Sequence, residues 1–187
     1  MKRLFVTIIL LTVPASVLAV PALSRAQAES VLAAEYAGQP LYWQPVQLPA
    51  LVPDAAVSPD AQLLVKLAEL DVLTRESRME MRDLGDGRSR VGLNWLYRWP
   101  QPEHDGIFYG IRRIASVDKV GSVVNQGDGW FADVSLTWFV TDMPLWTEHP
   151  DLAGIRLLRR SRESREKPFE TGVALEYRDA GWHVWHP

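Results

Sequence analysis

Residues 130–141, WFADVSLTWFVT, carry an apolar side chain at every even-numbered position, whereas four of the six odd-numbered positions are polar. Such alternation is typical of a β-strand that buries one face, because successive side chains point to opposite sides of a sheet. Met143 and Pro144 follow and end the run. We therefore expect one long strand, whose buried face carries Trp130, Ala132, Val134, Leu136, Trp138 and Val140.

The same alternation continues on both sides of this strand. Gly85-Asp86-Gly87 and Asp179-Ala180-Gly181 are turn sequences that join neighbouring strands into hairpins. The second half of the chain therefore reads as antiparallel β-structure. Further strands are predicted at residues 78–82, 91–99, 107–117, 169–177 and 182–185.

Helical spacing is clearest between Pro59 and Val72. Ser58 can cap such a helix, Pro59 suits its first turn, and leucines recur on one of its faces. Shorter helices are expected within residues 29–37 and 150–158. The predicted fold class is α+β, with one or two helices packed on a mainly antiparallel sheet.

Prolines dominate the sequence between these helices. Residues 38–59 hold five of them, and each removes a backbone donor. The stretch is also apolar, so we expect an extended strap laid over a core. The predicted organisation is a signal peptide over residues 1–28, a Pro-rich strap over 29–58 and one α+β domain over 59–187, with possible sub-lobes 59–99 and 103–187.

The first 28 residues have the pattern of an export signal. A basic start, Lys2-Arg3, precedes the apolar run LFVTIILLTV, and Ala26-Gln27-Ala28 fits the small-residue motif of signal peptidase. Residues 16–19, SVLA, offer an earlier cut. The alternative is an uncleaved anchor, since residues 4–23 are about long enough to cross a bilayer.

Charge and composition exclude several classes of protein. The 187 residues include 23 acidic and 20 basic side chains, eight Trp and no Cys. Loss of Lys2, Arg3 and Arg25 with residues 1–28 would lower the formal net charge from −3 to −6. Such a chain has no general field for nucleic acid, and it lacks the thiols for a disulfide scaffold or a lipid anchor.

Two segments resemble known types of protein. The C-terminal half resembles short exported bacterial proteins of no assigned function. The shared features are Phe108-Tyr109-Gly110, the long strand ending before Pro144-Leu145-Trp146, and the closing Gly181-Trp182 strand. That resemblance implies an envelope location and no catalytic residue. The helix followed by a hairpin at residues 59–99 resembles a winged-helix element, which implies a cytoplasmic DNA binder if the N-terminus is not a signal.

The candidate binding residues are basic or aromatic. Residues 156–167 carry six basic against two acidic side chains, a composition suited to anionic lipid head groups or an acidic partner, or simply to a solvated loop. Tryptophans near prolines or termini are more exposed candidates than those in alternating strands, which we expect in the core. The predicted contact residues are Arg156, Arg159, Arg160, Arg162, Trp43 and Trp146.

Signals for catalysis or metal binding are weaker. No HExxH or GxSxG motif occurs, and His183 and His186 are spaced for opposite faces of a strand. Asp133 and Glu176 could serve as acid and base in a hydrolase acting on envelope glycans, or simply face solvent. We expect no cofactor, no metal and no catalytic residue.

The sequence thus predicts a periplasmic or secreted, non-catalytic protein. Its expected partner is an envelope protein or a cell-wall or lipid component, with no nucleic acid and no membrane span after signal cleavage.

Overall fold

The strand at residues 130–141 belongs to the larger of two antiparallel sheets in the computed structural model. The model describes residues 20–36, 38–85, 87–101, 104, 106–127 and 129–186, so the predicted signal residues 1–19 lie outside the described part. The larger sheet has the order β1-β5-β7-β8-β9, with β6 paired to β7. Its strands are β1 (Pro40–Trp43), β5 (Ile107–Val120), β6 (Val124–Asn125), β7 (Trp130–Thr141), β8 (Phe169–Arg178) and β9 (Gly181–Val184).

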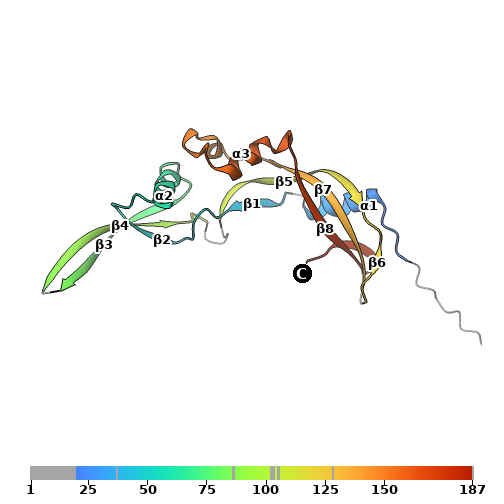
Figure 1. Cartoon of the computed structure of the whole chain (residues 1–187), viewed down its shortest axis with the longest axis horizontal. Helices are drawn as coiled ribbons and strands as arrows, with labels where there is room; N and C mark the ends of the chain where they lie inside the picture. Colours follow the sequence, from blue (N-terminus) through green and yellow to red (C-terminus); the bar gives the residue numbers. More distant parts are fainter. Residues whose placement is uncertain are drawn as a thin grey trace, which may run out of the picture.

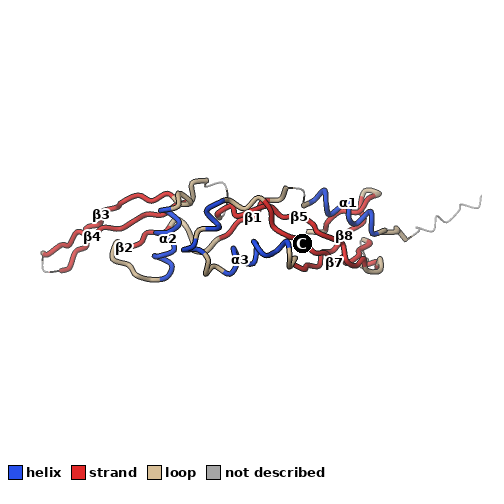
Figure 2. Tube along the Cα trace, turned by 90° about the horizontal axis from the view of Figure 1, so that it is seen from above, coloured by secondary structure: helices blue, strands red, loops and turns tan. Residues whose placement is uncertain are grey.

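The smaller sheet has three strands in the order β2-β4-β3. These are β2 (Ala50–Pro53), β3 (Thr74–Gly85) and β4 (Arg88–Arg98), and β3 pairs with β4 from Thr74↔Arg98 to Gly85↔Arg88. Figure 1 shows the two sheets following one another along the longest axis of the molecule, with the β3–β4 hairpin projecting at one end. Figure 2 shows the same elongated arrangement from above.

One hydrophobic cluster joins the two sheets. Helix α2 (Pro59–Glu69) contributes Leu64 and Leu67, and β4 contributes Tyr97, which is 1% exposed. The larger sheet contributes Ile107 and Val140 to the same cluster. The two sheets are therefore held together by shared burial of apolar side chains.

A second cluster lies between the larger sheet and helix α1 (Arg25–Glu35). Ala28 and Leu32 of this helix are fully buried, and they pack among Val134, Leu136 and Leu175 of the central strands. The predicted buried face of the long strand is confirmed for its inner positions, because Ala132, Val134, Leu136 and Val140 are all buried.

The α+β class is confirmed, but the winged-helix expectation is wrong. The structure is sheet-rich, and its larger sheet curves into a half-barrel. The hairpin after α2 does not return to a helical bundle, as a wing does. Its strands instead form a sheet with β2. The leucine face of α2 packs in the hydrophobic cluster shared by both sheets.

The helices also differ from expectation in number and extent. Three α-helices are described where one or two were expected, and α1 begins at Arg25 because Ser24 and Gln27 form a capping box. Helix α2 ends at Glu69 because Asp71 takes a left-handed conformation. Residues 145–165 hold η1 (Leu145–Glu148), η2 (Pro150–Leu152), α3 (Arg156–Arg162) and η3 (Glu163–Arg165).

The proline-rich segment contributes one short edge strand to each sheet. Strand β1 pairs with β5, and β2 pairs with β4. Both are edge strands, where a proline without its N–H does least harm. The segment thereby crosses from the larger sheet to the smaller one, beside the cluster that both share.

Candidate binding surfaces

The predicted basic segment is a short helix with two kinds of arginine. Arg160 donates to the carbonyl oxygens of Lys167 and Pro168, and its guanidinium lies 4.3 Å from the centre of the Phe169 ring. Arg162 donates to the carbonyl of Thr147. Arg156 and Arg159 are exposed. The structure thus gives Arg160 and Arg162 bonds that hold the chain together, and leaves Arg156 and Arg159 facing solvent.

The two predicted tryptophans come together although they are far apart in sequence. The rings of Trp43 and Trp146 are stacked with centres 6.4 Å apart, and both pack against the cluster that joins the sheets. Because η1 carries both Trp146 and Thr147, the arginine bond from α3 reaches the same corner of the molecule. The predicted contact residues are therefore neighbours, but four of the six, Arg160, Arg162, Trp43 and Trp146, make contacts within the fold.

A pocket of about 290 Å³ lies between the two sheets beside Trp146. Tyr42 stands at its rim, stacked on His104 with ring centres 4.7 Å apart. Asp71 and Gln101 supply its polar groups. Aromatic walls with few polar groups suit an apolar side chain or a sugar ring, but the volume is at the small end for a ligand pocket.

The other tryptophans of the alternating strands serve the interior. Trp95, Trp99 and Trp138 pack against the cluster that joins the sheets, and Trp130 packs against the second cluster. Trp138 lies between Phe169, 4.4 Å away, and the guanidinium of Arg112, also 4.4 Å from its ring centre. These side chains therefore pack against the two clusters, as predicted for tryptophans in alternating strands.

The two candidate carboxylates lie on one face of the larger sheet. Asp133 is opposite Ala174 and Glu176 is opposite Phe131, so the two acids are diagonal neighbours on adjacent strands. Asp133 alternates with buried Ala132 and Val134 and is exposed. An acid and base pair for glycan hydrolysis needs a cleft that holds the sugar between the two groups, and an open sheet face does not supply it.

The histidines make local contacts. His149 caps η2 through Nδ1, and His186 lies 3.2 Å from Glu35. Among the described residues, no three side chains of His, Asp or Glu gather closely enough to hold a metal ion. Separately, none of the helices in the described part is both long and apolar enough to cross a membrane.

The surface that the sequence argument missed is the projecting hairpin. We call residues 76–94 the arm. On one of its faces Met79 is opposite Leu93, and Met81 is opposite Val91. These four side chains, the apolar arm face, are 82%, 40%, 71% and 62% exposed in that order of naming. Contiguous apolar side chains with this exposure are typical of interaction surfaces.

The apolar arm face continues the buried face of the smaller sheet. Counting outward along β4, Tyr97 is 1% exposed, Trp95 is partly buried, and Leu93 and Val91 are exposed. Burial raises the pKa of the Tyr97 hydroxyl, against an opposing effect of the Arg75 guanidinium, so this phenol stays neutral at the root of the arm. The side chains on this face of β4 thus stay apolar or aromatic from the core outward, although their exposure to solvent rises.

A strand edge lies open beside this face. Strand β2 ends at Pro53↔Asn94, and the last bond of that ladder runs from Asp54 N–H to the carbonyl of Leu93, at 3.0 Å. Backbone groups along an antiparallel strand point to the same edge at every second residue, so those of Val91 also point past the end of β2. A hollow of about 410 Å³ occupies this place, lined by Pro53, Asp54, Val91 and Leu93.

The side wall of the hollow is fixed. The Trp95 indole N–H donates to Asp54 Oδ1 at 2.7 Å, which holds the turn after β2 against the strand. The outer edge of β3 is open as well, since among the described strands only β4 pairs with it. Among the described residues, the arm therefore presents an apolar face two strands wide, with the edge of β3 unpaired and the edge of β4 unpaired from Val91 outward.

Charges on the arm are mixed. Arg78 pairs with Glu76 at 3.0 Å, and Glu80 accepts from the Asn94 amide at 3.1 Å, both on the face away from the methionines.

Comparison of the chain with protein-family models, with curated proteins and with solved structures finds no match, so any function must be inferred from the residues and the fold themselves.

Proposed function

We propose that the protein is exported to the bacterial cell envelope and acts there, without catalysis, by binding an extended segment of a partner protein on its arm. The observation that carries the proposal is the apolar arm face, which lies uncovered beside the open edge of β4. An added strand at that edge would occupy the hollow where β2 ends.

Strand addition fits the chemistry of this edge. Backbone groups of a partner strand would pair with those of Val91 in the way that Asp54 N–H pairs with Leu93. Every second side chain of the added strand would then lie beside Val91 and Leu93, with Met79 and Met81 one strand further across. Unbranched methionines adapt to varied apolar partners at little cost.

Other occupants fit this surface less well. Lipid head groups would favour a basic cluster, whereas Arg78 is neutralised by Glu76 on the arm. A sugar would favour flat aromatic rings, and the apolar arm face has none. Neither occupant makes use of free backbone edges, whereas a protein segment does.

The contact residues predicted from the sequence enter this proposal in part. Arg156 and Arg159 are exposed and are proposed as a secondary contact for an acidic region of the same partner. Arg160 and Arg162 bind carbonyl oxygens of their own chain, so charge reversal at Arg160 would disturb the fold as well as any contact. Arg156→Glu/Arg159→Glu is the informative variant.

The two alternatives have less support. A hydrolase acting on envelope glycans would need walls around Asp133 and Glu176, and Asp133 is exposed on an open sheet face. A cytoplasmic DNA binder relied on a winged-helix element, and the hairpin forms a separate sheet with β2 instead. The chain also carries more acidic than basic residues.

Photo-crosslinking in cells that express the whole chain tests the proposal. A photoreactive amino acid is placed at Met79 or Val91 on the apolar arm face, at Arg90 on the other face, and at Val124, an apolar residue of β6 in the larger sheet that is 45% exposed. We expect protein adducts of one size from positions 79 and 91 and none from 124. Adducts of equal yield from all four positions, or none from the arm, contradict the proposal, as does an adduct with the mass of two copies.

A further inference from the structure

The folded protein includes part of the segment that the sequence assigns to the export signal. Residues 20–28 are described, and they hold the first turn of α1 together with the chain that leads into it. Ala28 is fully buried in the second cluster, and Leu23 packs against the same cluster. A cut after Ala28 would therefore remove the first turn of a helix that packs against the larger sheet in the folded protein.

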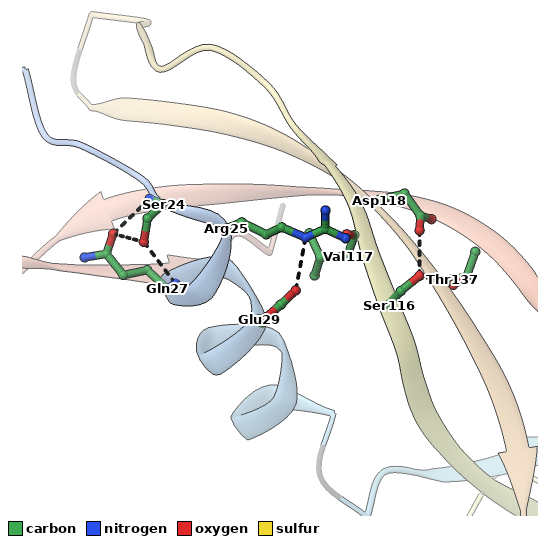
Figure 3. A network of polar contacts seen from close by, with 8 residues as sticks. All are labelled: Ser24, Arg25, Gln27, Glu29, Ser116, Val117, Asp118 and Thr137. Carbon is green, nitrogen blue, oxygen red and sulfur yellow. Dashed lines mark hydrogen bonds and ion pairs between the residues drawn. The ribbon is translucent and has the colours of Figure 1, made fainter.

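Polar contacts fasten the same turn to the sheet, as Figure 3 shows. The Ser24 hydroxyl accepts from Gln27 N–H at 3.2 Å, and the Gln27 side chain accepts from Ser24 N–H at 2.9 Å. Arg25 donates to the carbonyl of Val117 on β5 and pairs with Glu29. Loss of residues 20–28 would leave the rest of α1 without its cap and without this bond to the sheet.

The chain ahead of the helix is docked as well. The indole N–H of Trp182 donates to the carbonyl of Ala22 at 3.1 Å. If residues 20–23 keep these contacts, the apolar stretch left for a membrane span, residues 4–19, is shorter than the roughly 20 residues that a crossing helix needs. The fold thus disfavours both a cut after Ala28 and an uncleaved anchor.

We infer that signal peptidase cuts the chain between Ala19 and Val20, so that the mature protein begins Val20-Pro21-Ala22. Val17 and Ala19 supply small residues at the two positions that the enzyme reads, and Pro14 ends the apolar run shortly before them. This cut removes Lys2 and Arg3 and keeps Arg25 for its bond to β5. The inference rests on the export part of the proposed function.

The test is N-terminal sequencing and intact-mass measurement of the full-length chain expressed in a bacterium with an active signal peptidase. We expect the sequence Val20-Pro21-Ala22. A chain that begins at Glu29, or at any other residue, overturns the inferred site while leaving export intact. A chain that keeps residues 1–19 overturns export together with the site.

Two matched substitutions separate the competing cuts. Ala19→Leu puts a bulky residue at the inferred cut and should leave the precursor unprocessed. Ala26→Leu spoils the motif for the cut after Ala28, and it sits at an exposed helix position where leucine is tolerated. We expect normal processing of Ala26→Leu, and the reverse pattern would refute the inference.

A third comparison does not depend on the peptidase. Chains that begin at Val20 and at Glu29, each made without a leader, should differ in melting temperature, with the Glu29 chain melting lower. Equal melting temperatures would show that the first turn of α1 adds nothing to the fold, and would remove the structural basis of the inference.

Discussion

Replacing Met79 and Met81 with glutamine should weaken binding without weakening the fold. Fully burying a methionine side chain contributes about 1.5–3 kcal/mol. The two residues are 82% and 71% exposed in the free protein, so most of that contribution is still to be gained when a partner covers them. With both side chains fully covered by the partner, the double variant should therefore lose about 2–5 kcal/mol of binding free energy, roughly thirtyfold or more in affinity.

The same exposure predicts a small effect on folding. Surface substitutions away from packed features change the free energy of unfolding by less than about 0.5 kcal/mol. A matched control exists in Val57→Gln/Leu145→Gln, because these apolar residues are 79% and 87% exposed but lie outside the arm. The control should keep both its stability and its binding.

Two measurements on each variant decide the matter. Urea unfolding gives the free energy of unfolding, and the yield of the photo-crosslinked adduct from position 91 reports binding in the cell. The reasoning is refuted if the Met79→Gln/Met81→Gln chain is destabilised by more than about 1 kcal/mol, since the face would then be packed in the free protein. It is equally refuted if the adduct yield matches that of the control.

Three further predictions concern the fold that carries the arm. Leu32→Ala, which empties a fully buried site between α1 and the larger sheet, should lower the free energy of unfolding by about 2–5 kcal/mol in urea, whereas Ala33→Ser on the exposed face should not. Arg160→Ala should cost about 1–2 kcal/mol, since it removes bonds to two carbonyl groups and a ring contact, while Arg159→Ala next to it should be neutral; equal effects would contradict the distinction drawn between them. The hydrogen bond between Lys66 and Asp151, 2.8 Å apart, raises the pKa of Lys66 above its usual 10.5 and lowers the pKa of Asp151 below 3.8. The pair therefore stabilises the fold fully between those values, loses its effect as pH falls through the folded pKa of Asp151 or rises through that of Lys66, and should make the stability difference between wild type and Lys66→Ala vanish in acid.

Alternation in the sequence predicted which side chains share a face of a strand. Whether that face is buried depends on whether another element of the chain packs against it. The face of β7 with Val134 and Leu136 is buried because α1 covers it. The face of β4 with Val91 and Leu93 has the same pattern, and nothing described covers it. Periodicity fixes direction within a strand, whereas cover comes from elements elsewhere in the chain, which no local pattern encodes.

The predicted contact residues show the same limit for charge. Arg159 and Arg160 are adjacent and chemically identical, and a count of basic residues treats them alike. In the structure Arg160 reaches Pro168 and Phe169, while Arg159 faces solvent. Which of the two arginines makes contacts within the fold depends on the path of the chain after α3, which brings the carbonyl oxygens of residues 167 and 168 close to Arg160. A signal for the arm was nonetheless present, because Met79 and Met81 alternate with charged residues and so give this strand one apolar face.

The open edges of the arm argue that it is used. A long strand with unpaired backbone groups beside apolar side chains invites pairing with any other chain, and proteins usually blunt such edges with prolines, inward charges or short strands. Here the short strand with a proline is β2, which stops before Val91 instead of covering it. Of the charges of β3, Glu76, Arg78 and Glu80 lie on the face away from Met79, while Arg75 and Asp83, on the same face as the methionines, lie on either side of the apolar pair and do not interrupt it. The proposed partner, an extended segment of protein, would cover both the unpaired backbone edge and the apolar side chains, which a lipid head group or a sugar would leave exposed.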